Sequence, residues 1–587
     1  MLPPAPRGPS PATLLALLAA AGLALLLAHA WTYRAYVSDD AFIALRYADR
    51  LLHGHGLTWT DGERVEGYTS LLFVLACAAL GRLGVGLVLA QQLLSALGGV
   101  LVFVAFARAA RGRSPIAVAL AALVLASSGA LAVWCAGGLE ATLCAGWVAL
   151  AYVEVTRWLE APAARTVRRA ALWLGLAAVT RPDAALFCVL AAGLWLALGR
   201  VPFAARVRAA LTLCAIAALP ALLQLGVRLA YYHQLAPNTA LKLGLSRDHL
   251  RDGAAYLGAF ALGELFVLAL VAAAWWPRLQ IDRARRAVYA VPVLGFAAYV
   301  LAVGGDFMPG HRMLVPVVPL LAFLVIEVVD SLARAPRRFV ALALAAALVL
   351  GGALVQQVAP DNTLARSETW SWRALRLGEL LGQGYARERP LVAVDAAGAL
   401  PYGSRLPALD LLGLTDATIA RSPLQPGARH IIGHERGNGA YVLGRAPDLL
   451  VFNGPGGGAP RYPSGQQMAA DPRFARDYLP VELAVDDWRS AAYVRRAGRL
   501  GPRDEAGARI VPAVIVAALA HLPLRLGEGV PAVRLPAGAT FELPWSGGAA
   551  RVDVSGLVVE PAADGRVRLR ARTEVTLDEL RLTPAAG

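Results

Sequence analysis

The sequence predicts an α-helical membrane protein with many spans, followed by a soluble α/β domain. The 587 residues are 57% hydrophobic and only 17% charged, and the mean hydropathy is +0.53. A water-soluble globular protein does not contain repeated apolar runs of about 20 residues, the length that crosses a bilayer as a helix. Such runs fill the chain up to residue 358, and the sequence then becomes polar and rich in Pro and Gly.

The apolar runs predict about eleven transmembrane helices. We expect the first run, residues 12–30, to be a retained anchor and not a cleaved signal, because further spans follow at once. Residues 69–83 are short for a span, so they are expected to form a helix at the membrane surface. The other spans are expected at residues 86–107, 115–133, 139–157, 168–181, 182–199, 206–230, 255–276, 286–304, 312–333 and 339–358.

Arginine clusters orient these spans. Alternate loops carry clusters within residues 108–113, 157–169, 200–208, 278–286 and 334–338, and the positive-inside rule places all of them in the cytoplasm. If residues 69–83 were a span, every arginine cluster would lie outside the cytoplasm. The positive-inside rule therefore supports a count of eleven transmembrane helices. The same rule places the first outer loop, residues 31–85, and the polar C-terminal part on the extracytoplasmic side. The net charge of +15 is thus explained by topology, and no nucleic-acid binding is expected.

The change in composition divides the chain into a membrane domain, residues 1–359, and an extracytoplasmic soluble α/β domain, residues 360–587. Residues 391–395 are predicted to form a buried strand, and the alternating stretches beyond about residue 535 predict a β-rich end. All five cysteines precede residue 215, so the soluble domain must fold without disulfides.

The stretch from Tyr36 to Tyr47 places two adjacent acids, Asp39 and Asp40, just outside the membrane. Residues 38–52 have helical periodicity, and Ser38 or an Asp suits the N-cap. One interpretation is an amphipathic helix on the bilayer whose acids are merely favoured by the helix dipole. The other is a catalytic site. Both carboxylates are expected to face water, so Asn variants should keep the fold.

Four further outer loops carry polar residues that favour the site interpretation. Ionisable groups at membrane depth are costly, so several of them around one face indicate function. These loops are residues 134–140, 180–183, 237–242 and 304–312.

Transfer of a sugar from a lipid-linked donor fits this pattern. One carboxylate would take a proton from the acceptor hydroxyl, which suits Asp39 or Asp40. Cationic groups would hold the departing phosphate, which suits Lys242, His311 and Arg312. The carboxylates Asp306, Glu66 and Glu140 would orient sugar hydroxyls or one another. The other candidates for donor or acceptor binding are Arg46, Tyr68, Arg181 and Asn238.

Several of these residues also have structural interpretations. Arg312 would serve as a snorkelling anchor before its span, and His311 as an ordinary loop residue. Asn238 follows a proline, as helix caps and turn formers do. Glu140 opens a predicted helix, where an acid is favoured by the dipole, and Arg181 would pair with Asp183.

No nucleotide-binding loop, dinucleotide fingerprint or metal-ligand spacing is present in the sequence. The absence of a nucleotide motif agrees with a donor carried on lipid. No cofactor is required by this chemistry; the many carboxylates leave room for a divalent cation, but their spacing carries no metal signature.

Several motifs together resemble the GT-C glycosyltransferases, in particular the bacterial terminal β-(1→2) arabinofuranosyltransferases that use polyprenyl-phosphate-arabinofuranose. The resemblance extends from about residue 30 to 430 and rests on many short motifs. They are residues 38–47, Gly54-His-Gly-Leu57, residues 62–70, Gly138-Leu-Glu-Ala-Thr142, Thr180-Arg-Pro-Asp183, Pro237-Asn-Thr239 with Lys242, residues 304–312, residues 398–402 and residues 410–416.

The resemblance implies an inverting enzyme of the bacterial inner membrane with an outward-facing active site. Its partners would be a polyprenyl-phosphate sugar, a cell-envelope glycan acceptor and membrane lipid. It also implies an aspartate base in the first outer loop, a role that falls on Asp39 or Asp40. The resemblance does not fix the sugar, because relatives in this family differ in chemistry. Arabinofuranose is the leading candidate.

Two rival functions are a non-catalytic partner of a motor or envelope complex and a transporter. A transporter would show an internal repeat and broken helices at the midplane, whereas the charges here lie at one surface. A scaffold would have no chemical reason to keep the acid pair Asp39 and Asp40.

Overall fold

The computed structural model describes residues 10–242, 247–335, 338–425, 433–454, 458–547, 549–562 and 565–585. They form two compact units. The first consists of Met1–Gly54, Tyr68–Leu235 and Gly244–Thr369. The second consists of Trp370–Gly587 together with two segments from the first half of the chain, His55–Gly67 and Ala236–Leu243. Part of two expected outer loops therefore folds with the C-terminal residues, which hydropathy does not indicate.

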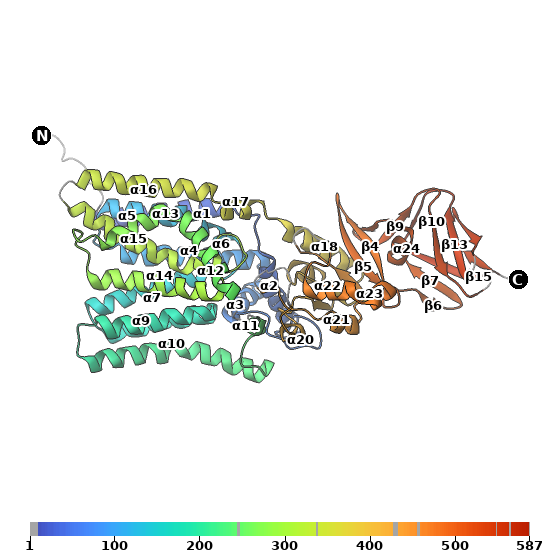
Figure 1. Ribbon diagram of the computed structural model, residues 1–587, viewed down its shortest axis with the longest axis horizontal. Helices are drawn as coiled ribbons and strands as arrows, with labels where there is room; N and C mark the ends of the chain where they lie inside the picture. The colour runs from blue at the N-terminus through green and yellow to red at the C-terminus, as the bar shows by residue number, and fades with distance from the viewer. Residues whose placement is uncertain are drawn as a thin grey trace. The chain divides into compact units, whose positions relative to one another are not determined.

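The first unit is a bundle of long helices with shorter ones at one end (Figure 1). The long and apolar helices lie side by side, and α2 and α17 are found at the same end of the bundle. Its helices are α1 (Pro11–Trp31), α2 (Asp39–Leu52), α3 (Leu71–Arg82), α4 (Leu87–Ala109), α5 (Pro115–Ser127), α6 (Gly129–Ala136), α7 (Ala141–Glu160), α8 (Ala164–Thr180), η1 (Pro182–Ala184), α9 (Ala185–Leu198), α10 (Phe203–Tyr232), α12 (Arg247–Gly263), α13 (Leu265–Ala272), η2 (Ala273–Trp275), α14 (Arg283–Val303), η3 (Arg312–Val317), α15 (Val318–Arg334), α16 (Arg338–Val358) and α17 (Pro360–Ser367).

The membrane character of this unit is confirmed, while the number of spans is not. Among the described residues, 6 helices are long and apolar enough to cross a membrane. The number rises to 8 if the bent pairs α5–α6 (52°) and α12–α13 (82°) each form one span. Helices occupy all the expected span positions, but α7, α8 and α9 do not meet that criterion. The count of eleven therefore stays a prediction.

Helix α15 forms the centre of the bundle, since every residue from Val318 to Ser331 is buried. Its last turns carry two buried acids that a half-buried arginine neutralises. Arg113 donates from Nη2 to Glu327 over 2.6 Å and from Nη1 to Asp330 over 2.9 Å. Buried charges are tolerated when they are paired and hydrogen-bonded in this way.

The second unit contains a parallel three-stranded core, extended by strands that pair antiparallel except that β8 pairs in parallel with β4. Its largest sheet has the order β14-β9-β8-β4-β5-β3-β1-β2, in which β1 pairs in parallel with β2 and β3. The predicted buried strand is confirmed as β1 (Val392–Val394). The other strands of this sheet are β2 (Ala408–Asp410), β3 (Leu449–Val451), β4 (Tyr478–Val485), β5 (Trp488–Arg495), β8 (Leu524–Leu526), β9 (Ala532–Leu535) and β14 (Val575–Leu577).

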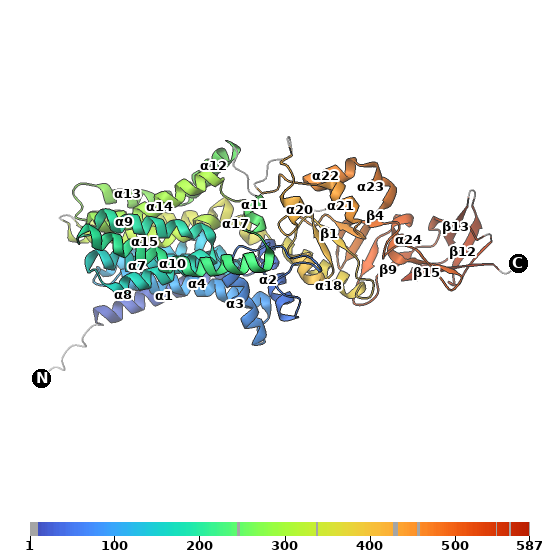
Figure 2. The same ribbon diagram turned by 90° about the horizontal axis from the view of Figure 1, so that it is seen from below.

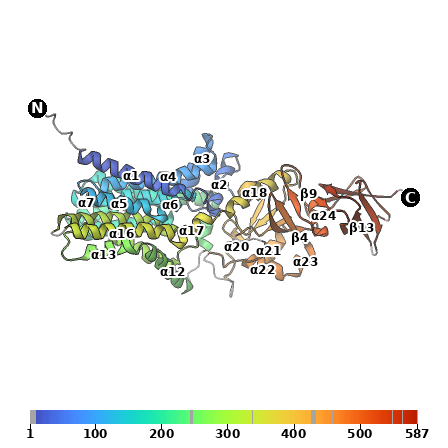
Figure 3. The same cartoon turned by 90° about the horizontal axis from the view of Figure 1, so that it is seen from above.

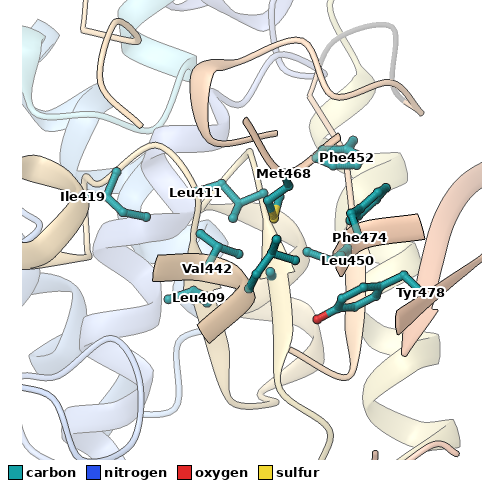
Figure 4. Packing of buried hydrophobic residues seen from close by; sticks show 11 residues of the cluster. Leu409, Leu411, Ile419, Val442, Leu450, Phe452, Met468, Phe474 and Tyr478 are labelled. Atoms are coloured by element: carbon teal, nitrogen blue, oxygen red, sulfur yellow. The ribbon is translucent and has the colours of Figure 1, made fainter. Parts of the chain in front are cut away.

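Helices cover the parallel part of this sheet, with α18 on one side of β1 and α21 and α22 on the other (Figure 2). Leu409 and Leu450 from the strands pack against Val442 and Met468 from the helices (Figure 4). The helices of this unit are α11 (Asn238–Lys242), α18 (Trp370–Gly384), α19 (Ala399–Ser404), α20 (Ala417–Ala420), α21 (Gly439–Arg445), α22 (Pro463–Ala470), α23 (Pro472–Asp477) and α24 (Ala513–Ala520).

The expected β-rich end is confirmed. Two smaller antiparallel sheets have the orders β10-β13-β12 and β11-β15-β7-β6. Alternating burial along β13, from exposed Arg566 to buried Ala571, matches the alternation of the sequence. Their strands are β6 (Arg503–Glu505), β7 (Ala508–Pro512), β10 (Thr540–Pro544), β11 (Ala550–Val552), β12 (Leu557–Pro561), β13 (Arg566–Ala571) and β15 (Glu579–Pro584).

Candidate functional site

The acid pair lies at the first turn of α2, which begins at Asp39 as the periodicity predicted. Ser38 is the N-cap residue, but its hydroxyl donates to Met308 Sδ over 3.7 Å and makes no capping bond. Asp39 is only 7% exposed and Asp40 is half-buried. The expectation that both acids face water is therefore wrong for Asp39. Helix α2 is buried on nearly all sides along Asp39–Asp49, which disfavours a helix that merely rests on the bilayer surface.

Contacts in the first unit join α2 to two other loops that sequence analysis singled out. Ser38 N donates to Gly137 O over 3.2 Å, and Trp134 Nε1 donates to Pro309 O over 3.1 Å. Gly138 has φ +83° in this turn, and a Cβ there would lie 2.8 Å from Gln91 Nε2. Only glycine fits such a left-handed and crowded position. The loops after α1, α6 and α14 are thus held together by backbone and buried aromatic contacts.

Arg312 is fixed at the centre of this group. Its Nε donates to Asp306 Oδ2 over 2.8 Å, and its guanidinium carbon lies 5.8 Å from the centre of the Trp134 ring. Asp40, Glu140 and Arg181 all lie within electrostatic range of the guanidinium. Pairing with Asp306 orients the planar cation, which is the arrangement that phosphate recognition requires.

Arg181 joins the fourth loop to the same cluster. It makes a two-pronged contact with Asp183, with distances of 3.1 Å from Nε and 2.6 Å from Nη2. Its Nη1 lies 3.7 Å from Glu140 Oε1. Burial acts to lower the Arg181 pKa, but the two acids outweigh it and raise the pKa well above its usual value. The predicted pairing with Asp183 is observed, and Glu140 is the additional partner.

Tyr36 belongs to the cluster and was missed as a candidate. Its ring packs edge-on against Trp134 at 5.8 Å, and its hydroxyl is buried without a hydrogen-bond partner among the described residues. Burial raises the pKa of Tyr36 well above its usual value, and neighbouring Asp306 and Asp40 add to this effect against Arg312. The hydroxyl is therefore neutral and lies amid charged groups. The only sequence signal was its position two residues before Ser38.

His311 lies beside a pocket of about 320 Å³ in the first unit. Its backbone is left-handed, with φ 46°, and its ring packs edge-on against Tyr256 and Phe260. Nδ1 lies 3.1 Å from Asp361 Oδ2 in the first turn of α17. Burial lowers the pKa of His311, and Asp361 opposes that effect. The interpretation of His311 as an ordinary loop residue does not account for this partner.

Two further candidates, Arg46 and Tyr68, are buried in the first unit. Tyr68 packs edge-on against Tyr47 at 4.8 Å, and its hydroxyl lies 3.1 Å from that of Tyr232. These contacts support the position of α2 within the unit.

Three candidates belong to the second unit. Glu66 is buried, and its carbonyl accepts a hydrogen bond from Asn238 N over 2.9 Å. Asn238 Nδ2 donates towards the carbonyls of Gly413 at 2.7 Å and Leu414 at 3.1 Å. Asn238 therefore ties its own segment to the loop after β2, which favours a structural role. The side chain of Lys242 lies outside the described residues.

No group of three or more His, Cys, Asp or Glu side chains in the described part of the chain is arranged to hold a metal ion.

Comparison with known proteins gives two sequence relatives. The chain is 31% identical over 333 residues to the terminal β-(1→2)-arabinofuranosyltransferase of Mycobacterium tuberculosis, covering 49% of this chain and 52% of the relative. It is 30% identical over 361 residues to the protein of the same name from Corynebacterium glutamicum, and the match covers 54% of this chain and 51% of that relative. The chain thus spans about half the length of these curated relatives. A domain of unknown function, DUF8728, matches residues 362–502.

Solved structures share the fold. ArnT from Cupriavidus metallidurans in the apo state has a TM-score of 0.54 and 14% identity, covering 81% of this chain and 97% of ArnT. ArnT bound to undecaprenyl phosphate has a TM-score of 0.52 and 14% identity, and the match covers 84% of this chain and 100% of ArnT. This chain therefore has the membrane GT-C fold, and the resemblance of its sequence to the terminal β-(1→2)-arabinofuranosyltransferases is confirmed.

Proposed function

We propose that this protein is a membrane glycosyltransferase that moves a sugar from a polyprenyl-phosphate donor to a cell-envelope glycan on the extracytoplasmic face. The observation that carries the proposal is the cluster of Asp40, Arg312, Glu140 and Arg181, which brings one member of the acid pair, Asp40, within electrostatic range of an oriented cation. The similarity to named arabinofuranosyltransferases and to a structure that binds undecaprenyl phosphate supports it. The names of these relatives indicate arabinofuranose as the transferred sugar.

The reaction is a single displacement that inverts the anomeric carbon. The acceptor hydroxyl attacks that carbon and gives its proton to Asp39 or Asp40. The bond between the anomeric carbon and the phosphate oxygen breaks, and polyprenyl phosphate leaves with the electron pair. Asp40 lies within electrostatic range of Arg312, the proposed phosphate ligand, and Asp39 is the more buried of the two acids; either carboxylate could take the proton.

Arg312 would neutralise the charge that grows on the departing phosphate. Because Asp306 and Trp134 hold the guanidinium in place, little reorganisation is needed when that charge appears. Glu140, oriented by Arg181, would accept hydrogen bonds from sugar hydroxyls, and the Tyr36 hydroxyl would donate one.

The apolar wall of the pocket beside His311 suits the first isoprene units of the donor. It is formed by Phe260, Leu262, Val355 and Val358. An apolar pocket with a few polar groups at one side is the usual form of a site for an amphipathic ligand.

The test uses the purified full chain in lipid nanodiscs and a panel of short-chain polyprenyl-phosphate sugars that includes arabinofuranose. Release of free polyprenyl phosphate is followed with and without an oligosaccharide acceptor. We expect release from one donor and only when the acceptor is present. If a folded sample releases no polyprenyl phosphate from any donor, the proposal is wrong and a non-catalytic role is favoured.

A further inference from the structure

The pair formed by His311 and Asp361 lies at the pocket and is built from two elements far apart in sequence. Asp361 is in the first turn of α17, directly after α16. Figure 3 shows α17 at the same end of the bundle as α2. Asp361 Oδ2 lies 3.1 Å from His311 Nδ1, and both residues line the pocket. Sequence analysis did not single out Asp361.

The position of Asp361 is fixed by its neighbour Asn362. Asn362 Nδ2 donates to Gln356 O over 2.8 Å, and Gln356 Oε1 accepts from Gly129 N over 2.8 Å. Gln356 Nε2 also lies 3.2 Å from Glu264 Oε1, at the break between α12 and α13. The first turn of α17 is therefore tied to α6, α16 and the broken helix.

The His311 ring is held on its other sides as well. Tyr256 and Phe260 pack against it with ring centres 5.2 and 5.6 Å away. Its left-handed backbone, next to Gly310 with φ 71°, restricts the ring further. A carboxylate partner at Nδ1 keeps a proton on that nitrogen, so Nε2 is the atom that interacts with a ligand.

We propose that Asp361 positions His311 so that imidazolium Nε2 donates a hydrogen bond to the departing phosphate of the lipid-linked donor. This inference rests on the proposed function. Arg312, the next residue in the chain, is the other proposed ligand of that phosphate. As the bond from the anomeric carbon to the phosphate oxygen breaks, that oxygen keeps the electron pair and the Nε2–H hydrogen bond strengthens. Asp361 does not contact the substrate and acts through His311.

The charged and titratable groups around His311 decide the pH dependence. Burial disfavours the protonated ring, while Asp361 and Asp306 favour it. Arg312 is the next residue in the chain, and Tyr256 and Glu264 are the other titratable groups near the ring or in the pocket. A bound phosphate adds negative charge and favours the protonated ring. Transfer is therefore expected to decrease as pH rises through the pKa of His311 in the donor complex.

The test measures the pH profile of transfer and the affinity for a short-chain polyprenyl phosphate in nanodiscs. Asp361→Asn should move the midpoint of the high-pH decline down by roughly one pH unit, because it removes a nearby opposite charge. It should also weaken phosphate binding severalfold at pH 8 and little at pH 6. Asp361→Glu should restore most of the profile, and His311→Gln should abolish this decline.

The matched control is His53→Gln. His53 also faces an aspartate, with Nδ1 3.4 Å from Asp49 Oδ1, but its side chain is 54% exposed. This variant should keep the wild-type profile. If Asp361→Asn and His311→Gln both retain the wild-type profile and phosphate affinity while the wild type is active, the inference is wrong. If the wild type neither binds polyprenyl phosphate nor transfers sugar, the proposed function itself fails.

Discussion

The change Tyr36→Phe separates a binding role of the hydroxyl from a structural one. In the structure the hydroxyl is buried and makes no hydrogen bond to any described residue, although the ring packs against Trp134. Leaving such a group without a partner costs about 1–3 kcal/mol. Phe keeps the ring and removes the desolvated oxygen, so the variant should be more stable than the wild type by up to about that amount.

The same variant should be a poorer enzyme. A hydrogen bond to a sugar hydroxyl contributes about 0.5–1.5 kcal/mol, so its loss lowers kcat/KM by roughly threefold to tenfold. Stability is measured by thermal unfolding of the full chain without donor, and activity by release of polyprenyl phosphate. Stabilisation by added donor should decrease in the variant for the same reason.

The matched control is Tyr385→Phe in the second unit. The Tyr385 hydroxyl is also buried without a partner among the described residues, but it is remote in sequence from every candidate. This variant should gain stability and keep wild-type transfer. If Tyr36→Phe is instead destabilised by more than about 1 kcal/mol, the hydroxyl is satisfied in the native state and the reasoning fails. Unchanged kcat/KM would remove Tyr36 from the site.

Three further predictions concern the framework within each of the two units. Arg113→Ala leaves Glu327 and Asp330 buried with weaker pairing, so the free energy of unfolding should fall by about 3 kcal/mol; a loss below about 1 kcal/mol would contradict this. Burial raises the pKa of Asp395 from 3.8 to about 7 in the folded chain, so its contribution to stability is complete below pH 4 and is lost as pH rises through 7. Asp395→Asn should therefore be more stable relative to wild type at pH 8 than at pH 5, by up to about 2.5 kcal/mol; thermal unfolding at both pH values measures this, and equal differences would refute it. Asn238→Ala removes the donor to the Gly413 carbonyl, so hydrogen exchange of residues 413–416 should accelerate, and unchanged protection would show that the contact is unimportant.

The sequence predicted the helices and the convergence of loops better than it predicted burial. Apolar length located the long helices of the first unit, because the bilayer sets the length of a span. The length of apolar runs does not indicate which loop segments fold with the C-terminal part. The sequence therefore did not predict that residues 55–67 belong to the second unit. Glu66 and Asn238 were grouped with the other candidates for that reason.

Partners of charged residues were predictable only when they were close in sequence. The pairing of Arg181 with Asp183 spans two residues and follows from local geometry. The pairing of His311 with Asp361 depends on how α17 packs against the bundle, which no local pattern encodes. Tyr36 escaped notice because an aromatic residue at a membrane boundary is common, and only the structure shows its hydroxyl among charges.

The most direct test of the central claim compares Asp39→Asn and Asp40→Asn with the wild type in nanodiscs. Acceptor-dependent release of polyprenyl phosphate is measured for all three, together with binding of the donor. The account predicts that one variant binds donor with nearly wild-type affinity and loses transfer by at least about a hundredfold, as expected for removal of a general base. If both variants keep wild-type turnover, the α2 carboxylates are not the base and the proposed mechanism is wrong.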